Sequence, residues 1–277
     1  MLQIVTDSST LYTVDEAREL GFEALPLCVN IGDMEGRDLL VDMEEFYARI
    51  GRGEIPKSSQ PPIGDVVETY EKYKEDEIID IAMADGLSGT YQTACSAAQM
   101  VENKENITVV NTKTLCGPHR YMVEKAQQMK LMGKTKQEIL DWLEYIKKKT
   151  ESFLIPQDFA FLKRGGRLAP MTANIGAVLK LKPIMTLTED GRQLKIFGIK
   201  RTMKSAVSTI IDHWKDLCLD ARHILYVVHA NVPEEAKQIA ERIKEAFPLT
   251  EIQIHPLSPV FVTQGGPACV ALQYIEK

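Results

Sequence analysis

The chain lacks long apolar runs, paired cysteines and any basic leader. None of its hydrophobic stretches approaches the roughly 18 residues of a membrane-spanning helix. The start of the chain, Met1 to Asp7, has no basic residues before its apolar ones and indicates a first strand, not a secretory signal. The five cysteines are scattered, which fits neither a zinc site nor a disulfide framework. We therefore expect a cytoplasmic protein with free thiols, no metal and no other cofactor.

Two fingerprints of nucleotide-binding enzymes are also missing, since the chain has neither a Gly-x-Gly-x-x-Gly pattern nor a P-loop lysine. The net charge of −6 argues against general affinity for nucleic acids. The charge is uneven, however. Residues 163–204 contain ten basic and two acidic side chains and so carry +8. This asymmetry favours an anion site or a surface for an acidic partner.

The first half alternates short apolar runs with amphipathic stretches, the pattern of βαβ units around a largely parallel sheet. Expected strands span 2–6, 23–29, 78–84 and 107–110, and expected helices include 42–50, 89–101, 121–132 and one that a capping box opens at Thr135. The second half predicts an antiparallel hairpin at 184–187 and 193–199, with further strands at 223–229, 251–255 and 260–263. We predict a Rossmann-like α/β domain over residues 1–150 and a two-layer mixed α/β domain over residues 151–277.

The segment Gly86-Leu87-Ser88-Gly89-Thr90 stands where a buried strand should end and a helix begin. Glycines allow a ligand close to the backbone, and the first amides of a helix lack internal partners and carry partial positive charge. The segment therefore favours a small anion. Ordinary turn and capping roles for glycine and serine are the alternative.

Two other hydroxyl clusters resemble it: Asp7-Ser8-Ser9-Thr10 after the first strand, and Ser58-Ser59-Gln60-Pro61-Pro62 before a helix. Each cluster alone is explained by helix capping. In an open parallel sheet, however, ligands bind beyond the carboxyl ends of the strands. We therefore expect the three clusters to converge on the polar end of a ligand.

Six segments are similar, in order and spacing, to the motifs of the DegV family of fatty-acid-binding proteins, and the resemblance spans essentially the whole chain. They are Asp7-Ser8-Ser9, Ser58-Ser59-Gln60-Pro61, Gly86-Leu87-Ser88-Gly89-Thr90-Tyr91-Gln92-Thr93-Ala94, Leu162-Lys163-Arg164-Gly165-Gly166-Arg167, Lys182-Pro183-Ile184 with Asp190-Gly191, and Arg201-Thr202. The resemblance implies two domains that hold one long-chain fatty acid, with the carboxylate at the interdomain cleft and the tail in an apolar tunnel.

By the same resemblance, the hydroxyls of Ser58 and Ser88 would bind the carboxylate, and the protein would be a non-catalytic lipid-binding subunit. Characterised members present the fatty acid to a separate bacterial fatty acid kinase, which feeds phospholipid synthesis. Contacts to the head group or to the kinase are expected from a further set, namely Ser59, Gly89, Thr90, Arg167, Arg201 and Gln264.

Two positions depart from the family pattern. Ala84-Asp85 stands where members often have two serines, and a carboxylate at Asp85 would repel a ligand carboxylate unless it points away or is protonated. Gln264 stands where many members carry a histidine. The head-group contacts are therefore expected to differ from those of other members.

A serine hydrolase is the main alternative, with Ser88 as the nucleophile, His229 or His255 as the base, and Asp7. Against it, Thr90 stands where a nucleophile elbow requires glycine. A nucleotide-binding enzyme has only Gly165-Gly166-Arg167 in its favour. Fatty-acid binding in a regulatory role, without delivery, is a further alternative.

Overall fold

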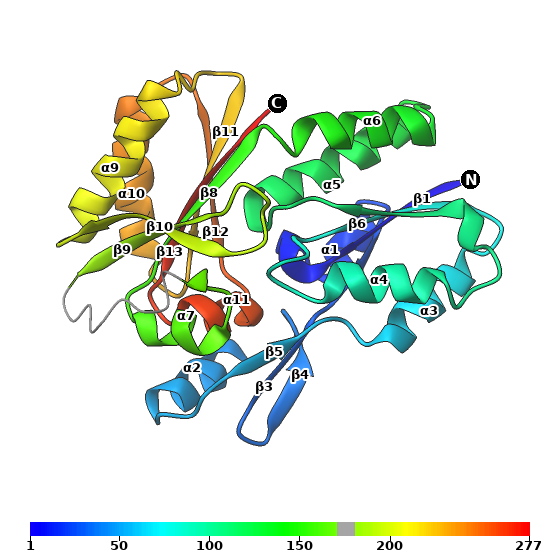
Figure 1. Cartoon of the computed structure of the whole chain (residues 1–277), viewed down its shortest axis with the longest axis horizontal. Coiled ribbons are helices and arrows are strands. Elements are labelled where there is room, and N and C mark those ends of the chain that lie inside the picture. The colour runs from blue at the N-terminus through cyan, green and yellow to red at the C-terminus, as the bar shows by residue number, and fades with distance from the viewer. Residues whose placement is uncertain (171–180) are drawn as a thin grey trace. The chain divides into compact units, whose positions relative to one another are not determined.

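The computed structural model describes residues 1–170 and 181–277, which divide into two compact units, Met1–Lys148 and Lys149–Lys277. Each unit has its own sheets, and Figure 1 follows the chain through both of them. Of the ten basic residues in segment 163–204, only Lys180 lies outside the described residues.

A four-stranded parallel sheet, in the order β2-β1-β6-β7, forms the centre of the first unit and confirms the predicted parallel sheet. Its strands are β1 (Leu2–Asp7), β2 (Glu23–Leu25), β6 (Glu77–Ala82) and β7 (Ile107–Asn111). Every residue of β6 after Glu77 is buried. Burial on both faces is typical of an inner parallel strand, because helices cover both faces of such a sheet.

Some helices of the first unit begin at polar capping residues that the sequence indicates. They are α1 (Val14–Glu19), α2 (Met43–Gly51), α3 (Ile63–Lys72), α4 (Thr90–Ala98), α5 (Cys116–Leu131) and α6 (Lys136–Ile146), with short 3₁₀ turns η1 (Ser8–Thr10) and η2 (Lys104–Asn106). Asp42 caps α2, and Thr135 forms the predicted capping box with Glu138. α5 begins five residues before the predicted start, because Pro118 lies in its first turn, where the missing N–H costs nothing.

A second, small antiparallel sheet belongs to the same unit, in the order β4-β3-β5. Its strands are β3 (Cys28–Ile31), β4 (Met34–Arg37) and β5 (Lys57–Ser59). The single strand predicted over 23–29 is wrong, since the chain passes from β2 in the parallel sheet to β3 in the small one. The break falls at Pro26, which has no N–H to give to a ladder.

A six-stranded mixed sheet, in the order β10-β9-β8-β13-β11-β12, forms the centre of the second unit. Its strands are β8 (Thr150–Ile155), β9 (Lys182–Leu187), β10 (Leu194–Lys200), β11 (His223–His229), β12 (Glu251–Pro256) and β13 (Val270–Glu276). β9 and β10 form the predicted antiparallel hairpin. β11 and β12 pair in parallel, and β13 runs antiparallel to its two neighbours.

Two long helices, α9 (Met203–Asp216) and α10 (Pro233–Ala246), cover one face of this sheet and are drawn in yellow and orange in Figure 1. Their apolar residues share a core with Phe153, Leu225 and Val227, and Trp214 is fully buried in it. Two short helices, α7 (Phe159–Gly165) and α11 (Pro259–Gly265), pack against each other, and Leu162 of α7 joins a separate cluster with Leu168 and Met185.

The strand predicted over 260–263 is wrong, because these residues lie in α11. Pro259 occupies the first turn of this helix, where its fixed φ favours helix formation. Val260 and Val262 are buried in the helix, so their β-branched side chains serve packing and not a sheet. The local start signal therefore outweighs the β propensity of the valines.

Across residues 1–170 and 181–277, none of the helices combines the length and apolarity that crossing a bilayer requires. The same residues contain no group of three or more His, Cys, Asp or Glu side chains that could hold a metal ion. All five cysteines are free thiols, of which Cys116 and Cys269 are buried.

Candidate ligand-binding site

The turn between β6 and α4 presents hydroxyls and amides together. Gly89 is the N-cap of α4, and Thr90 is its first residue. The Oγ of Ser88 lies 2.8 Å from Oγ1 of Thr90 and accepts a hydrogen bond from the Thr90 amide at 3.3 Å. Thr90 is buried and Ser88 half-buried. The predicted pairing of hydroxyls with the positive end of a helix is therefore present, and such an end favours negative charge.

The second hydroxyl loop lies against this turn. Ser58 and Ser59 belong to β5, and Gln60 follows them directly. A Cβ atom placed on Gly89 would lie 3.2 Å from Oε1 of Gln60, so the glutamine side chain packs on the glycine. Two of the three predicted clusters are therefore adjacent within the first unit, although 28 residues separate Gln60 from Ser88 along the chain.

The third cluster is buried and hydrogen-bonded within the first unit. Ser8, Ser9 and Thr10 are all buried. Ser8 donates to Oδ2 of Asp38 at 2.8 Å, and Thr10 donates to the carbonyl of Asp7 at 3.0 Å. This cluster is therefore part of the interior of the first unit, and its contact with a ligand stays a prediction.

Asp7 and His119 explain why that cluster is buried. One carboxylate oxygen of Asp7 accepts from the Ser9 amide, and the other accepts from the Met83 amide, both at 2.9 Å. His119 lies 2.7 Å from the Ser9 hydroxyl through Nδ1 and 2.9 Å from the Ile81 carbonyl through Nε2. Because burial lowers the pKa of His119, its ring is neutral, and Nε2–H donates to the carbonyl while Nδ1 accepts from Ser9.

A buried carboxyl group lies in the middle of β6. Asp80 accepts a hydrogen bond from the hydroxyl of Tyr70 at 2.5 Å. Burial raises the pKa of Asp80 to about 7, against the hydrogen bond from Tyr70, which lowers it, while the negative charge of Asp7 raises it further. Sequence reasoning missed this pair, since an aspartate within an apolar run gives no sign of its partner.

Asp85 is half-buried in the turn that carries Ser88. The hydrogen bond between Tyr91 and Cys95 raises the pKa of Tyr91, and burial and the charge of Asp85 add to the effect. The negative charge of Asp85 therefore acts on the first turn of α4, close to the hydroxyls described above.

Two predicted residues of the second unit meet at one glycine. The side chain of Gln264, from α11, packs on Gly165 so closely that a Cβ atom there would overlap its Oε1. Arg167 donates through its guanidinium to the carbonyl of the same glycine. Gln264 also donates to the hydroxyl of Thr263 at 3.0 Å. The basic motif 163–167 and Gln264 are therefore neighbours.

Arg201 has a separate place on the surface of the second unit. It lies in the turn between β10 and α9 and is exposed. The next residue, Thr202, caps α9 in a capping box with Ser205. The hydroxyl beside this arginine therefore serves the helix terminus.

The contacts of the proposed catalytic residues argue against a serine hydrolase. In the described part of the chain, the hydroxyl of Ser88 pairs with Thr90 and not with a histidine. His229 is buried and accepts from the Val232 amide through Nδ1 at 3.3 Å, and burial lowers its pKa. Both carboxylate oxygens of Asp7 hold backbone amides. The aspartate is thus committed to backbone structure.

His255, the other candidate base, lies on β12 with Nε2 3.1 Å from Oε1 of Gln253. A catalytic base would need a hydrogen bond to its nucleophile and a third group that orients it. The group described beside Nε2 of His255 is an amide oxygen on the same strand, which is neither a nucleophile nor an orienting carboxylate.

Comparison with known proteins extends over the whole chain. A family model described as "Uncharacterised protein, DegV family" matches residues 1–277. A DegV domain-containing protein of Listeria innocua is 34% identical, covering 99% of this chain and 98% of its own length. Another from Halalkalibacterium halodurans is 32% identical, with 100% and 99% covered.

Solved structures agree in fold. The DegV protein of Bacillus subtilis, described as a fatty acid binding protein, superposes with a TM-score of 0.88 at 30% identity, covering 100% of this chain and 99% of that one. A DegV family protein from Thermus thermophilus, whose structure is described in terms of fatty acid binding, gives a TM-score of 0.90 at 26% identity with the same coverage. Through its sequence and its fold, the chain belongs to the DegV family.

Proposed function

We propose that this protein is a non-catalytic subunit that binds one long-chain fatty acid through the hydroxyls of Ser58 and Ser88 and through an apolar tunnel for the tail. The observation that carries the proposal is the packing of Gln60 on Gly89, which brings the loops of the two serines together. The relatives from Bacillus subtilis and Thermus thermophilus, both described as binding fatty acids, support the ligand class.

The acyl tail and the carboxylate are expected to contribute differently to the free energy of binding. Burial of a C16 tail at about 0.8 kcal/mol per methylene would contribute roughly 10 kcal/mol. A charge-assisted hydrogen bond from one hydroxyl to the carboxylate would contribute about 1.5 to 3 kcal/mol. The tail therefore supplies most of the affinity, and the hydroxyls fix the orientation of the ligand.

The protein also delivers its ligand to a partner. It presents the bound fatty acid to a separate kinase that forms an acyl phosphate for phospholipid synthesis. Because such a kinase consumes ATP, the proposal locates both proteins in the cytoplasm. The residues assigned to the head group or to the kinase are Ser59, Gly89 and Thr90 in domain 1–150, and Arg167, Arg201 and Gln264 in domain 151–277. The charge of +8 over residues 163–204 supports contact with an acidic surface.

The first experiment is native mass spectrometry of the purified protein, with extraction and identification of any released lipid. A stoichiometric fatty acid of C14 to C18 length is the expected result. Bare protein that also takes up no added fatty acid would contradict the proposal and direct the search to other amphipathic anions.

The carboxylate assignment is tested by Ser58→Ala and Ser88→Ala, with Ser96→Ala as a matched control on the exposed side of α4. Each of the first two changes should weaken fatty-acid binding about 10- to 150-fold, the share of one charge-assisted hydrogen bond. The control should bind as the wild type does. Unchanged affinity in the double variant would remove both serines from the site.

The delivery step is tested by Arg201→Ala with the cognate kinase. Fatty-acid affinity should stay the same, because Arg201 is exposed, while phosphorylation of the bound lipid should fall. Unchanged turnover would remove Arg201 from the kinase contact. A fluorophosphonate reagent serves as the check on catalysis, since covalent labelling of Ser88 would contradict a non-catalytic role.

A further inference from the structure

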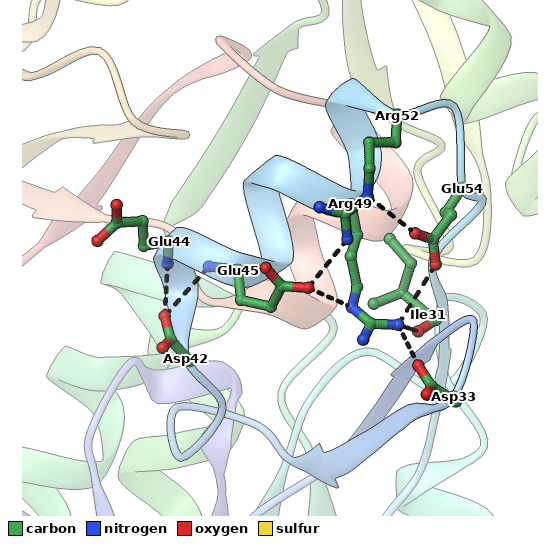
Figure 2. Close-up of polar contacts among 8 residues, drawn as sticks. All are labelled: Ile31, Asp33, Asp42, Glu44, Glu45, Arg49, Arg52 and Glu54. Atoms are coloured by element: carbon green, nitrogen blue, oxygen red, sulfur yellow. Dashed lines mark hydrogen bonds and ion pairs between the residues drawn. The ribbon is translucent and has the colours of Figure 1, made fainter.

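The guanidinium of Arg49 contacts four segments around the small sheet of the first unit (Figure 2). Arg49, on α2, donates to the carbonyl of Ile31 at the end of β3, at 3.2 Å. It also donates to Asp33 in the β3–β4 turn and to Glu45 one helical turn earlier, the latter at 2.8 Å. Glu54, on the segment that leads to β5, lies 3.4 Å from its Nη1.

Arg49 and its four partners, Ile31, Asp33, Glu45 and Glu54, form a partly buried network that we call the junction. The side chain of Arg49 is only 18% exposed. Gly32, with φ of +59°, forms the turn beneath it, and a Cβ atom there would lie 2.9 Å from Nη1 of Arg49 and would overlap Glu54. A single exposed ion pair contributes little to stability, but a network in which one planar group meets several fixed acceptors is more specific in geometry.

The junction is connected to the candidate site through β5. This strand has only three residues, and β3 is its one neighbour in the small sheet, where Ser58 pairs with Val29 and Ser59 pairs with Cys28. Arg49 contacts Ile31, the last residue of β3, and it contacts Glu54, which lies three residues before the start of β5. Such a short strand has little stability of its own, so its position depends on what is fixed on either side.

We propose that Arg49 is a positioning residue for the fatty-acid site, which acts by fixing β5 and therefore the hydroxyl of Ser58. The proposal rests on the proposed function for its ligand, and on the contacts of Arg49 for its mechanism. Without the guanidinium, the β3–β4 turn, the helix and the segment before β5 lose their common contact, and β5 is free to shift. A displacement of about 1 Å is enough to weaken a directed hydrogen bond.

Arg52 offers a matched control on the same helix. Its guanidinium shares two of the acceptors, Glu45 at 2.9 Å and Glu54 at 3.4 Å. It is 53% exposed, and the contacts drawn in Figure 2 connect it to neither Ile31 nor Asp33. Arg52→Gln therefore removes the same charge and two similar ion pairs, while it leaves the contact with β3 in place.

The experiment compares Arg49→Gln and Arg52→Gln by hydrogen exchange and by fatty-acid binding. In Arg49→Gln, the amides of residues 57–60 should exchange faster while those of β6 stay protected, and affinity should fall at least about tenfold and by no more than about 150-fold, the upper share of the Ser58 hydrogen bond. Arg52→Gln should change neither. Equal exchange at residues 57–60 in the two variants would overturn the proposal.

A double-mutant cycle separates positioning from a general structural effect. If Arg49 acts through Ser58, then Arg49→Gln should cost no further affinity in a Ser58→Ala background. The same fold-loss in both backgrounds would overturn the proposal. Failure of the wild-type protein to bind any fatty acid would instead refute the proposed function, and the exchange of residues 57–60 would still decide whether Arg49 fixes β5.

Discussion

Replacement of the buried Asp80 by asparagine should remove a pH dependence from the stability of the first unit. The pKa of this carboxyl group is raised from 3.8 to about 7, mainly by burial. Between these two values the folded state holds a proton that the unfolded state has released. Stability should therefore fall as the pH rises from about 4 and should level off above about 7.

The magnitude follows from the size of the shift. Each pKa unit corresponds to about 1.4 kcal/mol, so the whole window amounts to about 4 kcal/mol. Between pH 5 and pH 8, two units of the window are accessible, which gives a loss of about 2 to 3 kcal/mol. Asp80→Asn keeps an oxygen that can accept from Tyr70 but carries no titrating proton, so its stability should lack this slope.

The assay is urea unfolding at a series of pH values, followed by the fluorescence of Trp142 in the first unit. Trp214, the other tryptophan, is replaced by phenylalanine in all samples, so that only Trp142 is observed; its Nε1 makes no hydrogen bond within the described residues, and the loss of stability caused by the smaller ring is the same in every sample. Tyr70→Phe should extend the slope to higher pH, since the tyrosine hydrogen bond lowers the pKa of Asp80. A constant gap between wild type and Asp80→Asn from pH 5 to pH 8 would refute the reasoning.

Three further substitutions test the second unit by urea or thermal unfolding. Gly266→Ala should cost about 1 to 3 kcal/mol, because φ is +77° and the new Cβ would lie 2.9 Å from the ring of Phe161; wild-type stability would show that the turn adapts freely. Thr202→Ala should cost about 0.5 to 2 kcal/mol through loss of the cap of α9, and no change would mean that water replaces it. Phe153→Ala should cost about 3 to 5 kcal/mol, as its ring meets those of Phe197 and Trp214, and a loss below about 1 kcal/mol would indicate that the cluster collapses around the gap.

The parts of the fold that follow from the sequence are those with a local cause. β6 is a largely apolar run, interrupted by Asp80, between turns, and the hairpin of β9 and β10 surrounds a clear turn signal. Asp42 and Thr135 begin their helices through their own side chains. Such features need only neighbours along the chain, so periodicity and capping rules are sufficient to find them.

The parts that do not follow depend on distant partners. β5 is a strand only because β3 lies beside it, and three residues carry too little pattern to predict it. The burial of Ser9 depends on His119, which lies 110 residues away. In the candidate site, hydroxyl-rich loops could be named from the sequence, but which of them serve the core and which are adjacent to one another is decided by tertiary contacts.

The packing of Gln60 on Gly89 limits the residues that positions 60 and 89 can accept. The glycine's φ of −71° is open to any residue, and a Cβ atom there would lie 3.2 Å from Oε1 of Gln60, so the glutamine side chain would have to move by a few tenths of an ångström. A larger residue at position 89 therefore requires either a shift of the Gln60 side chain or a smaller residue at position 60. In evolution or in a mutant library, the two positions should change as a pair, and selection for a new head group should randomise both loops together.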